Sequence, residues 1–290
     1  MSDNEIDDVS GTETTGHEWD GIKELNTPMP RWWLWTFYAC IIWAIGYAIA
    51  YPAVPLINGA TKGLLGYSSR ANLDAELVTA KAEQAVYLQQ IDAMDVADIV
   101  KDDELARFAR AGGGSAFKVY CSQCHGSGAQ GAQGYPNLND DEWIWGGTPE
   151  AIYTTITHGV RYDADFDTRF NEMPGFGRDE ILAREQIVAV ANYVAGLSGG
   201  EADPVLAAEG ANVFADNCTA CHGEGGVGDA ELGGPAINNG IWLYGDGSVD
   251  SIMAQLNQPR HGVMPAWGTK LGDTTVKQLA VYVHGLGGGQ

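Results

Sequence analysis

The sequence predicts a mainly α-helical protein, with one membrane-spanning helix near the N-terminus followed by two similar helical domains. Three observations support this fold class. Residues 32–61 contain no Asp, Glu, Lys or Arg. Residues 112–198 and 207–290 form an internal repeat. No segment shows the sustained alternation of apolar and polar residues that is typical of a sheet.

The amino-terminal segment, residues 1–31, is polar and acidic. It carries eight acidic residues and two basic ones, and residues 1–30 show little apolar periodicity, so we expect most of them to be disordered. The segment also lacks the positive start, short apolar core and small-residue cleavage site of a secretory signal. We therefore expect it to be retained.

Residues 32–57 are predicted to form a transmembrane helix, because about 20 apolar residues suffice to span a bilayer. A buried core helix is the alternative, but 30 uncharged residues in a row are too many for one. Pro52 and Pro55 should end or kink the helix. Three tryptophans at its start should anchor it at the membrane interface: Trp32, Trp33 and Trp35.

The remaining boundaries follow from composition. Residues 58–111 mix charges with helical apolar spacing and are predicted to be a helical connector, which Gly112-Gly113-Gly114 should end. Residues 112–198 form the first predicted domain, residues 199–206 a small polar linker, and residues 207–290 the second domain.

The two domains repeat the same residues at similar spacing, each with a helix expected before its Cys motif and a closing helix at 184–197 or 275–286. The matched residues are Gly113, Phe117, Pro136, Trp145, His158-Gly159-Val160 and Met173-Pro174 in the first copy, and Gly210, Phe214, Pro235, Trp242, His261-Gly262-Val263 and Met264-Pro265 in the second.

Each copy contains a C-x-x-C-H motif, which supplies two thiols for the vinyl groups of a haem and an imidazole for its iron from a single turn. A zinc site is the main alternative, but zinc ribbons place their cysteine pairs about 15 to 20 residues apart, whereas Cys124 and Cys218 are 94 residues apart. A thioredoxin-like dithiol would need a strand–helix alternation that is missing. We therefore predict two covalently bound haem c groups in two tandem cytochrome c-type domains, held by Cys121, Cys124 and His125 and by Cys218, Cys221 and His222.

Met173 and Met264 are the predicted sixth ligands of the two haem irons. They occupy matching places, 48 and 42 residues after the motif His, and His–Met ligation gives a haem of raised potential. His158 and His261 are competing candidates, although we favour a surface or propionate-contacting role for both. An insertion at residues 161–172 separates His158 from Met173; its Asp-rich stretch lacks the Gly and Glu of an EF-hand, so we expect a solvated acidic loop.

The basic residues on the two sides of the helix are equal in number, so the positive-inside rule does not predict which side of the membrane the haem domains occupy. The predicted haems do. Attachment of haem c takes place outside the cytoplasmic membrane, so the helix should be an uncleaved signal anchor in a bacterial inner membrane. Residues 1–31 are then cytoplasmic and residues 58–290 periplasmic. The net charge of −22 divides into −6 on residues 1–31 and −16 on the rest. It argues against binding to nucleic acid and fits either simple solubility or docking of a basic cytochrome c.

Three runs near the amino terminus carry a family resemblance: Trp19-Asp20-Gly21-Ile22-Lys23-Glu24-Leu25, Pro28-x-Pro30-Arg31-Trp32-Trp33-Leu34-Trp35 and Tyr51-Pro52-Ala53-x-Pro55. With these runs, the chain resembles the dihaem subunit III of cbb3-type cytochrome c oxidases, the CcoP or FixP family. The resemblance covers essentially the whole chain and departs only in the length of individual loops.

The resemblance implies an electron-entry subunit that is not itself the catalyst. It would accept electrons from a cytochrome c donor and pass them, with a monohaem cytochrome c subunit, to the haem-copper subunit that reduces oxygen and pumps protons. It also implies that the Met of one domain can serve the haem of the other, and local pairing is the simpler default. The alternatives are an anchored dihaem cytochrome c of another respiratory complex, or a dihaem peroxidase, which would need one open iron.

Overall fold

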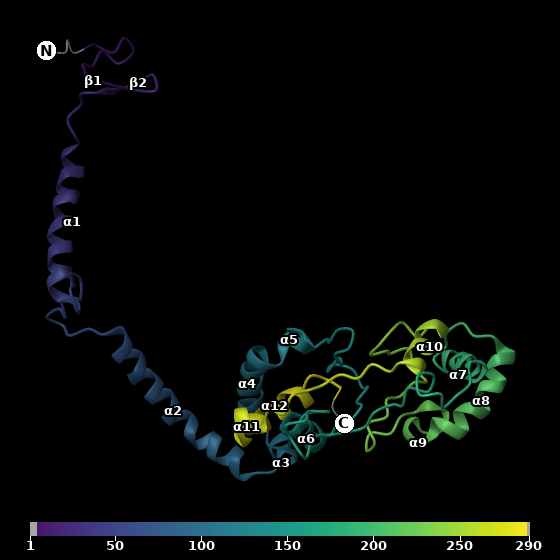
Figure 1. The fold of residues 1–290 in the computed structure, drawn as a ribbon. Coiled ribbons are helices and arrows are strands. Elements are labelled where there is room, and N and C mark those ends of the chain that lie inside the picture. The colour runs from purple at the N-terminus through teal and green to yellow at the C-terminus, as the bar shows by residue number, and fades with distance from the viewer. Residues whose placement is uncertain (1–4, 289–290) are drawn as a thin grey trace. The chain divides into compact units, whose positions relative to one another are not determined.

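The computed structural model describes residues 5–288 and is mainly helical, as the sequence predicts (Figure 1). Two short hairpins are formed by β1 (Thr14–Trp19) with β2 (Ile22–Leu25) and by β3 (Pro55–Leu56) with β4 (Gly59–Ala60). The helices are α1 (Arg31–Ala50), α2 (Ser69–Ala93), α3 (Val96–Lys101), α4 (Asp103–Tyr120), α5 (Ser122–His125), α6 (Pro149–His158), α7 (Arg184–Leu197), α8 (Pro204–Asn217), α9 (Thr219–His222), η1 (Glu224–Gly226), α10 (Val249–Asn257), α11 (Gly268–Leu271) and α12 (Asp273–His284). By contacts, the chain divides between Lys81 and Ala82 into an N-terminal and a C-terminal part.

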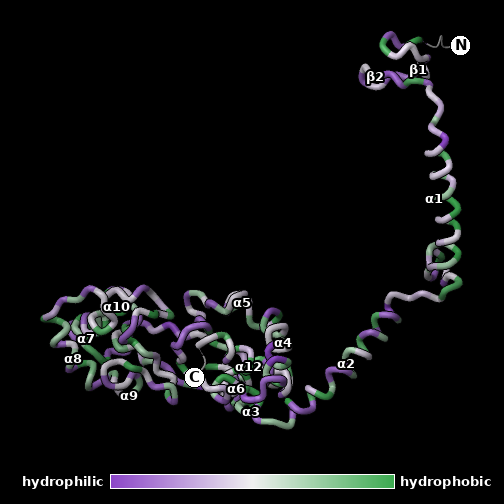
Figure 2. Tube along the Cα trace, turned by 180° about the vertical axis from the view of Figure 1, so that it is seen from behind, coloured by the Kyte–Doolittle hydropathy of each residue, from purple (hydrophilic) through white to green (hydrophobic). Residues whose placement is uncertain are grey.

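Helix α1 is the predicted membrane-spanning helix. Among the described residues it is the one helix long and apolar enough to cross a bilayer, and none of its side chains is buried within the chain. Figure 2 colours it hydrophobic to neutral over most of its length, whereas α2 mixes both kinds of residue. It ends at Ala50 because Tyr51 is extended, and the residue before a proline disfavours helical geometry.

The hairpin of β1 and β2 corrects the expectation of disorder for residues 14–25, whereas residues 1–4 lie outside the described residues. Trp19 pairs with Ile22, and the two residues between them, Asp20 and Gly21, both have positive φ, at 49° and 85°. Asp-Gly with two positive φ angles is the preferred two-residue turn of a hairpin. Asp20-Gly21 therefore indicates a hairpin turn, although the composition of the segment indicates no secondary structure.

Helix α4 runs through Gly112-Gly113-Gly114 instead of ending there. These glycines let α12 approach closely, since a Cβ on Gly113 would lie 2.1 Å from the carbonyl oxygen of Gln278. Gly210 in α8 plays the same part: its Cβ would lie 2.1 Å from the carbonyl oxygen of Ala189 in α7. Both glycines serve packing between helices.

The closing helices cross between the two repeats. The Phe117 ring of α4 lies 5.3 Å from the Tyr282 ring of α12, and the Phe214 ring of α8 lies 5.2 Å from the Tyr193 ring of α7. Helix α12, which closes the second repeat in sequence, therefore packs on the Cys-motif helix of the first. Helix α7 packs in turn on the Cys-motif helix of the second repeat.

Two hydrophobic cores result, and they do not coincide with the sequence repeats at 112–198 and 207–290. The first unit is built from the end of α2 with α3, α4, α6 and α12. The second unit is built from α7, α8 and α10 with Phe176 and Leu182 before them. In Figure 1 these helices form separate groups. The second unit is thus one continuous stretch of chain, inserted between α6 and α12 of the first.

The two units share a further detail that revises one matched pair. Thr148 caps α6 and Ser248 caps α10 with their side-chain oxygens. The preceding glycines, Gly147 and Gly247, lie against the indole rings of Trp143 and Trp242. By position, the counterpart of Trp242 is therefore Trp143 and not Trp145.

Candidate haem-binding sites

The first site consists of Cys121, Cys124 and His125, where α4 gives way to the single turn of α5. The amide of Cys121 still bonds to the carbonyl of Phe117 at 2.9 Å, and the amide of His125 bonds to the carbonyl of Cys121 at 3.0 Å. Because the backbone stays turned like a helix, the thiols and the imidazole all come from adjoining turns of chain. The second site, Cys218, Cys221 and His222, repeats this arrangement after α8, with the same bonds at 2.9 Å.

The first cysteine of each motif is not an activated thiol. Burial raises the pKa of Cys121 and of Cys218 to about 11, whereas a redox-active C-x-x-C pair needs a lowered pKa. Within the described part of the chain, the two cysteine pairs do not gather into one cluster of metal ligands. The geometry disfavours both the dithiol and the four-ligand zinc alternatives.

Each motif histidine is oriented by a proline carbonyl. His125 Nδ1 lies 3.1 Å from the carbonyl oxygen of Pro136, and His222 Nδ1 lies 2.8 Å from that of Pro235. A carbonyl can only accept, so Nδ1 carries the proton and Nε2 is left unprotonated, as an iron ligand requires. Burial also lowers the pKa of both imidazoles, which keeps them neutral. Sequence comparison matched the two prolines but assigned them no role.

Each candidate methionine lies in the unit that holds the Cys motif of the other repeat. Met173, from the first repeat, lines one pocket together with Cys218, Cys221 and His222 of the second site. Met264, from the second repeat, packs against the core that contains Phe117 and borders Cys121. Local pairing is the simpler expectation, and the exchange of closing helices places each Met, which precedes its helix, in the unit that holds the other motif.

The pocket at the second site fits a haem by the chemistry of its walls. Two thiols, an oriented imidazole and a thioether face it, and apolar side chains such as Phe176, Val190 and Leu256 complete the lining. Arg161 and Arg260 also border the pocket. Haem carries two acidic propionates, so these cations are candidate partners for them, and burial lowers the pKa of the Arg161 guanidinium. Sequence reasoning missed Arg161, which stands at the start of the insertion.

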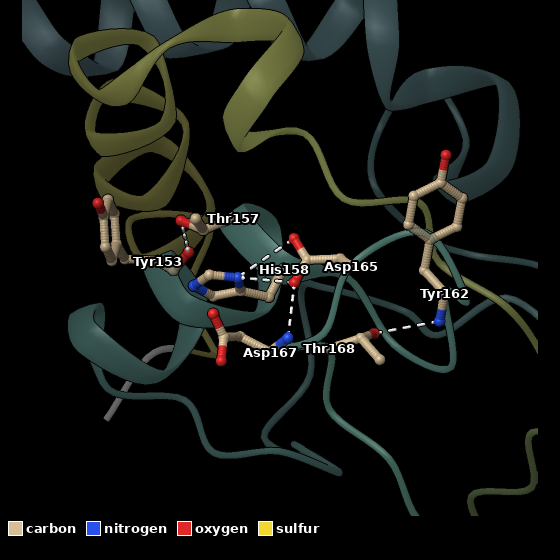
Figure 3. Close-up of polar contacts among 7 residues, drawn as sticks. All are labelled: Tyr153, Thr157, His158, Tyr162, Asp165, Asp167 and Thr168. Atoms are coloured by element: carbon tan, nitrogen blue, oxygen red, sulfur yellow. Dashed lines mark hydrogen bonds and ion pairs between the residues drawn. The ribbon is translucent and has the colours of Figure 1, made fainter.

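Each of the two competing histidines has a hydrogen-bond partner of its own. His158 Nδ1 lies 3.1 Å and 3.3 Å from the two carboxylate oxygens of Asp165, and the amide of Asp167 donates to Asp165 at 2.9 Å (Figure 3). The acidic loop of residues 161–172 thus folds against His158. These contacts explain why the side chains of His158, Asp165 and Asp167 lie close together. His261 Nε2 accepts a hydrogen bond from the backbone of Met173 at 3.1 Å.

Comparisons with known proteins agree with this geometry. The family described as "N-terminal domain of cytochrome oxidase-cbb3, FixP" matches residues 11–58, and the family "Cytochrome C oxidase, cbb3-type, subunit III" matches residues 109–194 and 205–283. Both matched segments of the second family contain one C-x-x-C-H motif.

Full-length relatives carry the same description. The chain is 56% identical to the Cbb3-type cytochrome c oxidase subunit FixP of Rhizobium meliloti (strain 1021) over 98% of both chains. It is 50% identical to the subunit CcoP of Cereibacter sphaeroides over 96% of this chain and 95% of that one. Since the likeness runs through the hairpin, the membrane helix and both Cys motifs, the chain belongs to the family of cbb3-type cytochrome c oxidase subunit III.

Proposed function

We propose that this chain is the dihaem electron-transfer subunit of a cbb3-type cytochrome c oxidase, taking electrons from a cytochrome c donor and relaying them toward the haem-copper subunit in aerobic or microaerobic respiration. The observation that carries the proposal is that each unit holds one C-x-x-C-H motif and one candidate methionine. A haem bound there supplies a reversible one-electron carrier. With an imidazole and a thioether available to each haem iron, neither site would offer an open position for substrate, which disfavours a peroxidase.

The ligand sets are crossed. Met264 serves the haem at the first site, and Met173 serves the haem at the second site. Packing supports this assignment, because Met264 borders the first core and Met173 lines the pocket of the second site. Each motif imidazole is fixed by its proline carbonyl, so each site has one ligand of set orientation. Rigid ligation suits electron transfer, since little has to move when the charge changes.

Loops from the two haem sites are in contact, which favours electron transfer between the haems. The amide of Gly134, in the loop after the first motif, donates to the carbonyl of Leu243 at 2.8 Å. A Cβ on Gly233 would lie 2.3 Å from the ring of Trp145. The loop after the first Cys motif therefore lies close to the loop after the second Cys motif. The loops that enclose the two haem sites are therefore in direct contact.

The remaining assignments follow from helix α1 and from charge. Helix α1 anchors the chain in the bacterial inner membrane, with residues 1–31 in the cytoplasm and residues 58–290 in the periplasm, where haem c is attached. The partners are the haem-copper catalytic subunit and the monohaem cytochrome c subunit. The isolated chain is a relay and not an enzyme.

Purification tests membership of a complex. Solubilised in mild detergent, the chain should come out with a copper-containing haem protein and a second c-type cytochrome, and its own haem content should be two per chain. A chain with two haems but no copper protein at any mild condition would favour the anchored cytochrome of another respiratory complex. Stoichiometric carbon monoxide binding at either of its haems would contradict the closed-relay assignment.

Ionic strength tests the donor. The part of the chain beyond residue 31 carries a charge of −16, so the association rate with a basic cytochrome c should fall about tenfold or more between low and high salt. Stopped-flow reduction of the complex measures this rate. A small uncharged reductant serves as the control and should show little salt dependence. Equal salt dependence for both donors would argue against electrostatic docking.

A further inference from the structure

Met173 is held by a side chain from the other repeat. Its backbone amide donates a hydrogen bond to Nε2 of His261 at 3.1 Å, across 88 residues of sequence. Since the amide is the donor, Nε2 must be the unprotonated nitrogen of a neutral imidazole. Both residues line the pocket that contains His222 of the second site. The bond therefore fixes the backbone of the proposed ligand at the edge of the haem site.

Arg161 reinforces this contact from both sides. Its Nε donates to the carbonyl of Gly262 at 2.7 Å, and its Nη1 donates to the carbonyl of Asn171 at 2.9 Å. One of these carbonyls belongs to the residue after His261, and the other lies two residues before Met173. The planar guanidinium thus ties together the two segments that the His261 bond joins, because its donors are held in one fixed plane, whereas the donors of a Lys ammonium lie on a single flexible atom.

The first site is built differently at the matching place. The amide of Met264 donates to the carbonyl of Val160 at 3.0 Å, and the amide of Val160 donates back to the carbonyl of Met264 at 2.9 Å. His158, the counterpart of His261, bonds to Asp165 instead. Met264 is therefore held by two main-chain hydrogen bonds. The amide of Met173 instead donates to a side chain, the imidazole of His261, which a substitution can remove.

We propose that His261 is a positioning residue for Met173, and that its imidazole, with the guanidinium of Arg161, holds the Met173 peptide so that the thioether reaches the second haem site. The inference rests on the proposed function, in which Met173 is the axial ligand of that haem. His261 does not itself ligate iron. Without its hydrogen bond, the Met173 segment should spend more time away from the haem.

The test compares five variants with the wild-type chain, each full-length, haem-loaded, in detergent and labelled with ¹³C-methyl methionine. A methyl group that lies over a haem ring is shifted far upfield in the reduced state, so each Met-ligated haem should give one such resonance, and Met173→Leu assigns the one from the second site. His261→Leu removes the acceptor at similar size. His261→Gln returns an acceptor near the position of Nε2. His158→Leu is the matched control in the other repeat.

In His261→Leu, the Met173 resonance should broaden or weaken while that of Met264 stays unchanged. The apparent affinity of the reduced second haem for carbon monoxide should rise roughly fivefold, since one hydrogen bond no longer favours the closed state. His261→Gln should restore most of the wild-type behaviour, and His158→Leu should match wild type. Arg161→Lys, which keeps the charge, should behave like His261→Leu.

Each other outcome overturns the proposal in a recognisable way. If His261→Leu leaves the Met173 resonance and carbon monoxide affinity unchanged while Met173→Leu abolishes that resonance, the ligand assignment stands and the positioning role fails. If His261→Gln is as impaired as His261→Leu, the imidazole acts by packing and not as an acceptor. If Met173→Leu leaves both upfield methyl resonances in place, the ligand assignment fails and the inference with it.

Discussion

A Met264→His chain should keep both haems but lower the midpoint potential of the haem on Cys121 and Cys124, the motif of the other repeat. Imidazole binds haem iron well and favours the oxidised state more than a thioether does. Axial ligands spread haem potentials over about 0.8 V, so the fall should be on the order of a few hundred millivolts. A spectroelectrochemical titration of the full chain would then separate two c-type haems of very different potential.

The reciprocal variant decides between crossed and local ligation. Met173→His should lower the potential of the haem on Cys218 and Cys221 and leave the first haem unchanged. The haems can be told apart in chains that lack one pair of motif cysteines, where a single haem remains. If Met264→His shifted the haem on Cys218 and Cys221 instead, ligation would be local and the crossed assignment would be wrong.

Gly113→Ala should destabilise the first unit by about 3 kcal/mol, at the upper end of what overpacking usually costs. The added Cβ would lie 2.1 Å from a backbone oxygen of α12, and a backbone atom cannot turn aside as a side chain can. Alanine also has the better helix propensity, worth about 1 kcal/mol, but this gain is smaller than the clash. Thermal unfolding of the haem-loaded chain should show a midpoint lower by about 10 °C.

Two glycine-to-alanine changes serve as comparisons for Gly113→Ala. Gly210→Ala should have a similar effect on the second unit, because its Cβ meets the backbone of α7 at the same 2.1 Å. Gly240→Ala should change little, since nothing lies within 4 Å of its Cβ, and surface changes usually stay within about 0.5 kcal/mol. Equal stability of Gly113→Ala and Gly240→Ala would mean that α4 and α12 are not in close contact.

Much of the fold and site was readable from local sequence. The C-x-x-C-H motifs, the membrane helix and the closing helix at 184–197 each depend on residues that are neighbours in the chain, and the structure has that helix with the same bounds. The hairpin was not predicted, because the acidic composition and weak apolar periodicity of the segment indicate disorder, although Asp20-Gly21 is a typical turn dipeptide.

The exchange between the repeats could not be predicted from sequence. Gly113 with Tyr282 and Gly210 with Tyr193 are chemically the same contact, so either closing helix would suit either Cys-motif helix. Which pairing forms depends on chain geometry over long distances, such as the length of the insertion after His158 and the short linker before α8. The Gly triplet was misread for a related reason, since a packing glycine and a helix-ending glycine look alike until the neighbouring helix is known.

The insertion of one unit within the other also sets an order of assembly as the chain emerges. The second unit has its methionine, its Cys motif and its core helices complete once residue 257 has left the ribosome. The first unit presents its Cys motif much earlier but lacks Met264 and α12 until nearly the end of synthesis. The motif that is made first is therefore the last to receive its closing helix.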